Sequence, residues 1–258
     1  MQQQPSRLGR RAIDQVGVEH ELPVGVVFGS LLEDLGRRER HELLDLVEPD
    51  TAADALEEMD PKELHQLLAE TDIPKAARLV ARMEPDEAAD ALRDLSEEDR
   101  SALLAALPPK DASALRSVLE FPADSAGGAM TTVLVLAHPE DTVAEVRHRL
   151  TGQAEHLVDL DAIIVVDGEG RLVDDISLFE LLLAEPDTRL SDLIGPPWPV
   201  TVTTEADVRE VADRMIDARR LSVVVLDEAD RPLGRILADD VLDAVISGHR
   251  RWQFPRTR

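Results

Sequence analysis

Apolar residues recur with a period of twelve positions between residues 36 and 119, through seven consecutive units without an insertion. Most units begin with an acidic, polar or proline residue and end with aliphatic ones. The eighth position of every unit is apolar, at Leu43, Ala55, Leu67, Leu79, Ala91, Leu103 and Leu115. Helices confined to so few residues are marginal alone and need neighbours that bury their apolar side. The pattern therefore predicts an N-terminal superhelix of short α-helices.

Proline supports the phase of this repeat. It occupies the second position of four units, as Pro49, Pro61, Pro85 and Pro109. Proline suits the first turn of a helix because its missing N–H would have no partner there. An acidic residue precedes three of these four prolines, which suits a helix cap and the positive end of the helix dipole. We therefore expect each helix to begin near the start of its unit.

Beyond residue 119 the helical period gives way to runs of β-branched residues, after a turn-rich segment at 120–128. These runs predict strands at 133–137, 162–167, 171–178, 199–204, 222–227 and 232–239. Amphipathic stretches between them predict helices at 142–150, 178–185, 207–220 and 239–248. The order is β-α-β-β-α twice, and tight turns at 167–170 and 227–230 join adjacent strands. Each copy exposes one apolar sheet face, so we expect the two copies to pack as one pseudo-symmetric domain.

The predicted fold class is multidomain α plus α/β. Residues 24–28 could form a strand or an ordered lead-in, and this alternative stays open. The expected divisions are a lead-in at 1–29 that is disordered apart from such a strand, the helical-repeat domain at 30–121, a joint at 122–129, the two β-α-β-β-α copies at 130–186 and 187–248, and a basic tail at 249–258.

Composition narrows the class of function. The chain has 258 residues, no cysteine and a formal net charge of −25. The lack of cysteine excludes disulfides, thiolate zinc sites and cysteine nucleophiles. Both halves are acidic, which argues against a nucleic-acid partner, because such binding depends on neutralising phosphates. No apolar stretch reaches the roughly 20 residues of a membrane span, and no secretory signal or paired nucleophile and base is evident, so we expect a cytoplasmic protein that is not an enzyme.

Four short motifs carry a resemblance to a known family: EPDEAAD at 84–90, DSAGGAMT at 124–131, AEPDTR at 184–189 and DDVLD at 239–243. With the repeat and the paired copies, they resemble the cytosolic region of MgtE magnesium transporters over about residues 31–246. That region is an MgtE N domain followed by a pair of CBS domains. Family members continue into a membrane domain, so we expect either a stand-alone relative or a fragment of a transporter.

Carboxylates stand at helical spacings that place them on one face, such as Asp86 with Asp90 and Asp240 with Asp243. Like charges at these spacings destabilise an isolated helix, and a bridging cation would reverse that effect. Mg²⁺ takes one or two carboxylates and keeps most of its waters. The competing interpretation of each carboxylate is a solvated surface acid. The resemblance implies metal ligands at Asp86, Glu87 and Asp90 of the helical domain and at Asp207, Asp217, Asp240 and Asp243 of the CBS pair.

The resemblance also raises adenine nucleotides such as ATP or AMP as ligands. CBS pairs often bind them through a Gly-x-x-Ser/Thr-x-x-Asp signature, of which each copy here keeps only part. Ser177 in the first copy and Gly234 and Asp240 in the second are the candidate nucleotide-binding residues. The arginines that could hold phosphates are Arg219, Arg220 and Arg235.

The resulting hypothesis is a Mg²⁺-responsive regulatory module linked to magnesium transport, with ions bridging the acidic faces of its two domains. Without Mg²⁺ we expect the domains to swing apart about residues 120–129. We also expect a homodimer through the CBS domains, and association with the membrane through a pore subunit. Two alternatives remain open: a nucleotide-sensing CBS adaptor, and a protein-interaction scaffold in which the metal has no role.

Overall fold

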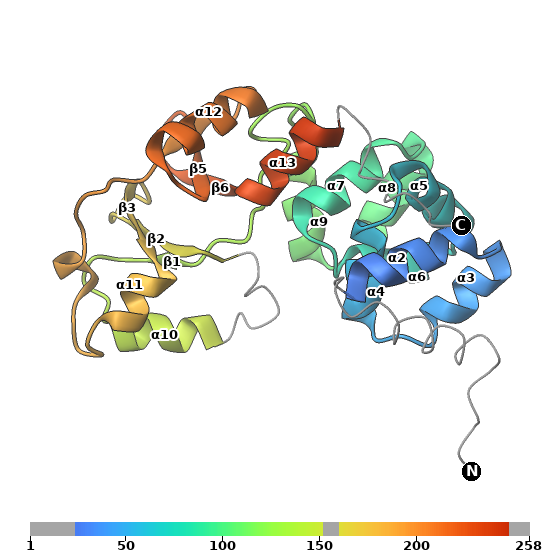
Figure 1. Cartoon of the computed structure of the whole chain (residues 1–258), viewed down its shortest axis with the longest axis horizontal. Coiled ribbons are helices and arrows are strands. Elements are labelled where there is room, and N and C mark those ends of the chain that lie inside the picture. Colours follow the sequence, from blue (N-terminus) through green and yellow to red (C-terminus); the bar gives the residue numbers. More distant parts are fainter. Residues whose placement is uncertain (1–23, 152–159, 248–258) are drawn as a thin grey trace, which may run out of the picture. The chain divides into compact units, whose positions relative to one another are not determined.

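The chain divides into two compact units, with the division after Arg116. The computed structural model describes residues 24–151 and 160–247, so the expected basic tail and most of the expected lead-in lie outside the described residues. Figure 1 draws the first unit in blue to green and the second in green to red. Across the described ranges, no helix is both long enough and apolar enough to cross a membrane.

The first unit is a run of short helices, and the predicted repeat is confirmed. One helix corresponds to each twelve-residue unit, and a further helix precedes them. The helices are α2 (Val24–Asp34), α3 (Arg37–Leu44), α4 (Pro49–Glu57), α5 (Pro61–Glu70), α6 (Ile73–Val80), α7 (Pro85–Arg93), α8 (Glu97–Ala106) and α9 (Pro109–Leu119).

Helix starts follow the phase of the repeat. The first residue of a unit is the N-cap of α3 through α8 in turn. The side chains of Asp60, Asp72 and Ser96 accept a hydrogen bond from a backbone N–H in the first turn of their helices. Glu48 and Glu84 make no such bond to their own helices, although proline follows both. Local capping chemistry thus explains most of the boundaries.

Stacking of alternate helices forms the core of this unit. Helix α2 packs on α4, α4 on α6, and α6 on α8, while α5 packs on α7. The apolar eighth position of every unit is at most 9 % exposed. Burial of these aliphatic side chains stabilises helices that are too short to persist alone.

The interpretation of residues 24–28 as a strand is wrong, because they form the first half of α2. Gly25 and Gly29 lie one turn apart on the face of α2 that meets α4. A Cβ atom would stand 2.9 Å from the carbonyl oxygen of Asp54 at the first position and 2.8 Å from that of Ala55 at the second. The helical spacing of two glycines permits this close backbone approach.

The second unit contains two sheets in its described part, and both have the expected β-α-β-β-α order. Their strands are β1 (Leu136–Ala137), β2 (Ala162–Val166) and β3 (Leu172–Ser177), then β4 (Thr201–Thr203), β5 (Ser222–Leu226) and β6 (Pro232–Leu237). The helices are α10 (Val143–Thr151), α11 (Leu178–Leu183), α12 (Val208–Ala218) and α13 (Ala238–Ser247), with a 3-10 turn, η2 (Leu190–Asp192), after α11. The edge strands β1 and β4 are shorter than expected.

The two copies repeat each other in detail. In each sheet the first pair of strands is parallel and the second is antiparallel, with a bulge near the end of the central strand. One carboxylate oxygen of Asp167 accepts two backbone N–H groups in the β2–β3 turn, and Asp227 does the same in the β5–β6 turn. The predicted turns between adjacent strands are confirmed. Each copy has its own aliphatic core, and a third cluster around Ile164, Val166 and Val224 joins the two sheets.

The joint residues are bound to the second copy. The N–H of Ala126 donates to the carbonyl of Ala206 at 2.7 Å, and the N–H of Gly127 donates to that of Thr204 at 2.9 Å. The hydroxyl of Ser125 donates to the carbonyl of Pro122 at 2.7 Å and closes the turn. Residues 125–127 therefore belong to the fold of the second copy.

We predict that Gly128→Ala destabilises the second unit by about 3 kcal/mol, because a Cβ atom would overlap the carbonyl oxygen of Pro122. Chemical denaturation followed by circular dichroism would measure the loss. Gly168→Ala is the matched control, since no atom lies within 4 Å of the Cβ position there. Equal stabilities of the two variants would contradict this account of the joint.

Candidate functional site

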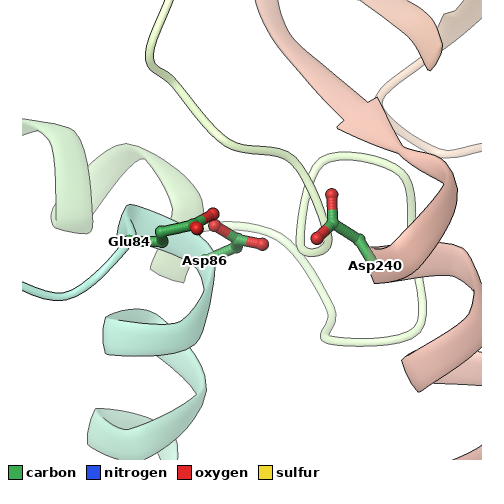
Figure 2. A group of neighbouring side chains, drawn as sticks. All are labelled: Glu84, Asp86 and Asp240. Atoms are coloured by element: carbon green, nitrogen blue, oxygen red, sulfur yellow. The ribbon is translucent and has the colours of Figure 1, made fainter. Parts of the chain in front are cut away.

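Acidic side chains gather at the start of α7 in the helical unit. Glu84 is the N-cap, and carboxylate oxygens of Glu84 and Asp86 lie within 4.8 Å of each other. Figure 2 shows these two side chains side by side at the beginning of the helix. Asp86 is only 7 % exposed, which is unusual for a carboxylate. The pair offers hard oxygen ligands of the kind that Mg²⁺ prefers.

The other two predicted ligands of α7 differ in environment. Glu87 is half-buried in the first turn, beside Asp86 in the sequence. Asp90 is exposed and accepts a hydrogen bond from Nε of Arg93 at 3.0 Å. The positive end of the helix dipole favours carboxylates in a first turn, so Asp86 and Glu87 stabilise α7 even without a metal.

Three of the four predicted ligands on the CBS copies, Asp207, Asp217 and Asp240, lie near helix ends. Asp207 is the N-cap of α12 and accepts the N–H of Arg209 at 2.7 Å, whereas Asp217 is exposed near the other end of that helix. Ten residues of helix separate them by about 15 Å, too far for one ion. Asp240 accepts the N–H of Leu237 at 2.8 Å in the first turn of α13, and Asp243 follows it one turn later. Figure 2 shows the Asp240 carboxylate at the start of this helix.

The predicted nucleotide-binding residues have structural roles in their own copies. The hydroxyl of Ser177 donates to the Glu180 carboxylate at 2.6 Å and accepts the Glu180 N–H, which makes a capping box for α11. A Cβ atom on Gly234 would meet the carbonyl of Thr131 at 2.6 Å. Asp240 caps α13 in the way that Glu180 caps α11. These contacts account for the three residues without a ligand.

Two of the three candidate phosphate-binding arginines pair with carboxylates of the chain. Arg235 is 1 % exposed and contacts Asp161 at 2.5 Å and Asp175 at 3.3 Å. Arg220 approaches Asp175 at 3.5 Å, while Arg219 is an exposed C-cap in the left-handed region. We did not expect this buried charge cluster from the sequence, because no local motif connects residues so far apart in the chain.

Burial dominates the electrostatics of the cluster. It raises the pKa of Asp174 above its usual value, although the N–H groups of Gly195 and Asp175 donate to that carboxylate. Burial also raises the pKa of Asp175, and the nearby Arg220 and Arg235 oppose this shift. Burial lowers the pKa of Arg235, and the nearby Asp161 and Asp175 oppose this shift. Removing these charges from water thus outweighs their mutual attraction.

Comparison with protein families identifies both units. The MgtE intracellular N domain matches residues 28–124, and the CBS domain matches residues 126–187 and 198–247. The matched N domain and the curated relatives belong to a transporter family and not to an enzyme family.

Curated relatives and solved structures agree with this assignment. The magnesium transporter MgtE of Enterococcus faecalis is 37 % identical over 84 % of the chain, and that of Thermus thermophilus is 35 % identical over 54 %. These matches cover 48 % and 31 % of the relatives, so the chain matches less than half the length of either.

Two solved structures cover nearly the whole chain. The soluble part of a magnesium transporter is 26 % identical, with a TM-score of 0.82 and coverage of 94 % of both chains. The cytosolic domain of the Mg²⁺ channel MgtE in complex with ATP is 28 % identical, with a TM-score of 0.71. It covers 90 % of this chain and 99 % of that one.

The raised pKa of Asp174 gives a pH prediction. The folded protein holds this proton more tightly than the unfolded chain, so the carboxyl stabilises the fold most at low pH. That stabilisation is lost as the pH rises from the unfolded pKa of about 4 through the higher folded pKa. Asp174→Asn does not titrate, so its stability relative to the wild type should rise with pH across this interval. Denaturant unfolding at a series of pH values measures the difference, and parallel profiles would contradict the prediction.

Proposed function

Because the chain carries an MgtE intracellular N domain followed by a CBS pair, and so belongs to the MgtE family, we propose that it is a Mg²⁺-responsive regulatory module that controls magnesium transport. The observation that carries this proposal is the match of both domains, in the same order, to the soluble part of a magnesium transporter over 94 % of the chain. Transport itself would require a membrane pore, which we propose as the partner of the module.

Charge supplies the driving force of the proposed switch. The chain carries a formal net charge of −25, and carboxylates cluster at helix starts in both units. In the absence of a divalent cation these charges repel, which opposes a closed arrangement. Mg²⁺ binds carboxylates while it keeps several waters, so it can bridge two acidic surfaces without a cage built by the protein.

We assign the bridging role to Asp86, Glu87 and Asp90 on the helical unit and to Asp207, Asp217, Asp240 and Asp243 on the CBS unit. Support for Asp86 comes from its burial beside Glu84, an additional candidate ligand that was not expected from the sequence. Since Asp207 and Asp217 lie at opposite ends of α12, they would serve different ions. Mg²⁺ shifts the equilibrium towards closure only by the difference between its affinities for the closed and open forms.

The hinge of this switch would lie in the first part of residues 120–129. Residues 125–127 are hydrogen-bonded to the second CBS copy. We therefore propose that the movement is confined to residues 120–124.

The first test is solution X-ray scattering during a Mg²⁺ titration at constant ionic strength. We expect the radius of gyration to fall in the millimolar range, and K⁺ alone to leave it unchanged. Asp240→Asn combined with Asp243→Asn should raise the Mg²⁺ concentration at the midpoint about tenfold, equivalent to about 1.4 kcal/mol of binding free energy.

The control for this double variant is Asp213→Asn with Asp239→Asn, which also removes two charges, both exposed, one on α12 and one on α13. Its midpoint should stay near that of the wild type. A radius of gyration that does not respond to Mg²⁺ would contradict the proposed switch. Equal shifts in both double variants would mean that net charge, and not a defined site, governs the response.

Nucleotide sensing is the second candidate function, because one similar structure is a complex of an MgtE cytosolic domain with ATP. Against it, Ser177 and Asp240 make hydrogen bonds at the starts of their own helices, and Arg235 is paired with carboxylates. The same scattering titration with ATP at fixed free Mg²⁺ separates the two functions, since only a nucleotide sensor would respond to the added ATP.

We also propose that the module is a homodimer through its CBS domains. Helix α11 exposes three large apolar side chains, Phe179, Leu182 and Leu183, each at least 67 % exposed. Leu242 on α13 is exposed as well. Soluble surfaces rarely leave such groups in water together unless a partner covers them.

Leu182→Glu with Leu183→Glu should therefore convert the dimer to a monomer, because two carboxylates would have to be buried in the interface. We expect the dissociation constant to rise at least 100-fold in sedimentation experiments, which corresponds to about 2.7 kcal/mol. Leu46→Glu is the control, since Leu46 is a similarly exposed leucine of the helical unit. A wild-type monomer at all concentrations, or an unaffected double variant, would contradict the proposed interface.

A further inference from the structure

The buried charge cluster joins the two CBS copies. Arg235 of the second copy lies on β6, and Nη1 donates to Asp161 at 2.5 Å and to the carbonyl of Ala162 at 3.0 Å. Nη2 donates to Asp175 on β3 at 3.3 Å. All three acceptors belong to the first copy. The hydroxyl of Ser222 on β5 also donates to Asp161, at 2.6 Å. Two residues of the second copy therefore donate hydrogen bonds to this carboxylate.

The same cluster holds the segment between the copies. The N–H of Gly195 donates to the buried carboxylate of Asp174 at 2.9 Å. Arg220 follows α12 and donates to the carbonyls of Pro197 at 2.5 Å and Trp198 at 3.1 Å, and it also faces Asp175. The charges that face the core of the cluster thus come from both sheets and from the end of α12.

Asp175 and Arg235 occupy equivalent positions in the two copies. Asp175 is the register partner of Ile164 in the first sheet, and Arg235 is the register partner of Val224 in the second. Ile164 and Val224 are themselves equivalent residues of the two central strands. The pseudo-symmetry of the unit therefore places opposite charges at the same site of its two halves.

This arrangement distinguishes the possible pairings of the copies. When the first copy packs on the second, Asp175 meets Arg235. When two first copies pack together, carboxylate faces carboxylate, and two second copies bring guanidinium against guanidinium. Like charges in a buried interface are strongly unfavourable, and such repulsion is a common means of excluding wrong partners.

A contribution to stability is a weaker explanation for the cluster. Breaking a buried ion pair is costly, but replacing the whole pair with apolar residues is often neutral or stabilising. The Nε atom of Arg235 is also buried without a hydrogen-bond partner among the described residues, which adds to the cost of keeping an arginine there. Burial of Arg235 is unfavourable, and an apolar residue could take its place. Its presence therefore indicates a role in specificity.

We propose that the Asp175–Arg235 ion pair directs the first CBS copy onto the second copy of the same chain and excludes packing between like copies. Asp161 adds a second carboxylate of the first copy beside Arg235. Asp174 and Arg220 bind the segment between the copies. This ion pair holds the two CBS copies together as one body, independently of any response to Mg²⁺.

The test compares Arg235→Met with the double variant Asp175→Leu/Arg235→Met in the full chain. Arg235→Met should lower Tm by roughly 10 °C, because it leaves Asp175 buried without its arginine. The double variant should regain most of this loss. Arg209→Met is the control, since Arg209 is an exposed arginine of α12.

The decisive readout is hydrogen exchange at the amide of Leu172, which donates across the copies to the carbonyl of Asp230. In the double variant we expect this amide to exchange at least tenfold faster than in the wild type despite the restored Tm, because both pairings become available. Wild-type exchange in the double variant, or an unchanged Tm in Arg235→Met, would overturn the proposal. If Arg235→Met does not fold, the exchange rate of the double variant still decides the question.

Discussion

Helices of eight to eleven residues cannot persist in isolation, and the first unit depends on this constraint. Stability has to come from the contact of alternate helices, so each helix must present an apolar residue at the same phase. Small residues then set how closely helices approach, as Gly25 and Gly29 show where α2 meets α4. The acidic residues are left at the helix starts, where capping and the helix dipole favour them.

Those acidic helix starts connect the fold to the proposed function. A carboxylate at the N-terminal end of a helix stabilises that helix. Asp207 and Asp240 do so by accepting hydrogen bonds from backbone N–H groups. A carboxylate has two oxygen atoms, so in the proposed switch a carboxylate that caps a helix can also bind a hydrated cation. In the proposed switch, the carboxylates that cap helices would also bind Mg²⁺, so a dedicated metal cage is not needed.

The CBS unit has a different constraint, because its two similar copies could pack against each other or against like copies. Two copies with the same strand order, turn geometry and bulge positions could pair in more than one way. Opposite charges at the equivalent positions Asp175 and Arg235 make one pairing favourable. Residues 125–127 of the joint are also hydrogen-bonded to the second copy and so belong to the same unit.

The sequence by itself determined most features that depend on neighbouring residues. The phase of the repeat, the caps at Asp60, Asp72 and Ser96, and the two strand–helix copies all follow from local periodicity and capping chemistry. Only the tertiary structure decided that residues 24–28 are helical and that Arg235 meets Asp161. The spacing of Gly25 and Gly29 becomes informative only beside α4, and a charge pair between residues 161 and 235 leaves no periodic trace. Contacts between distant segments depend on how the elements pack, which no local pattern encodes.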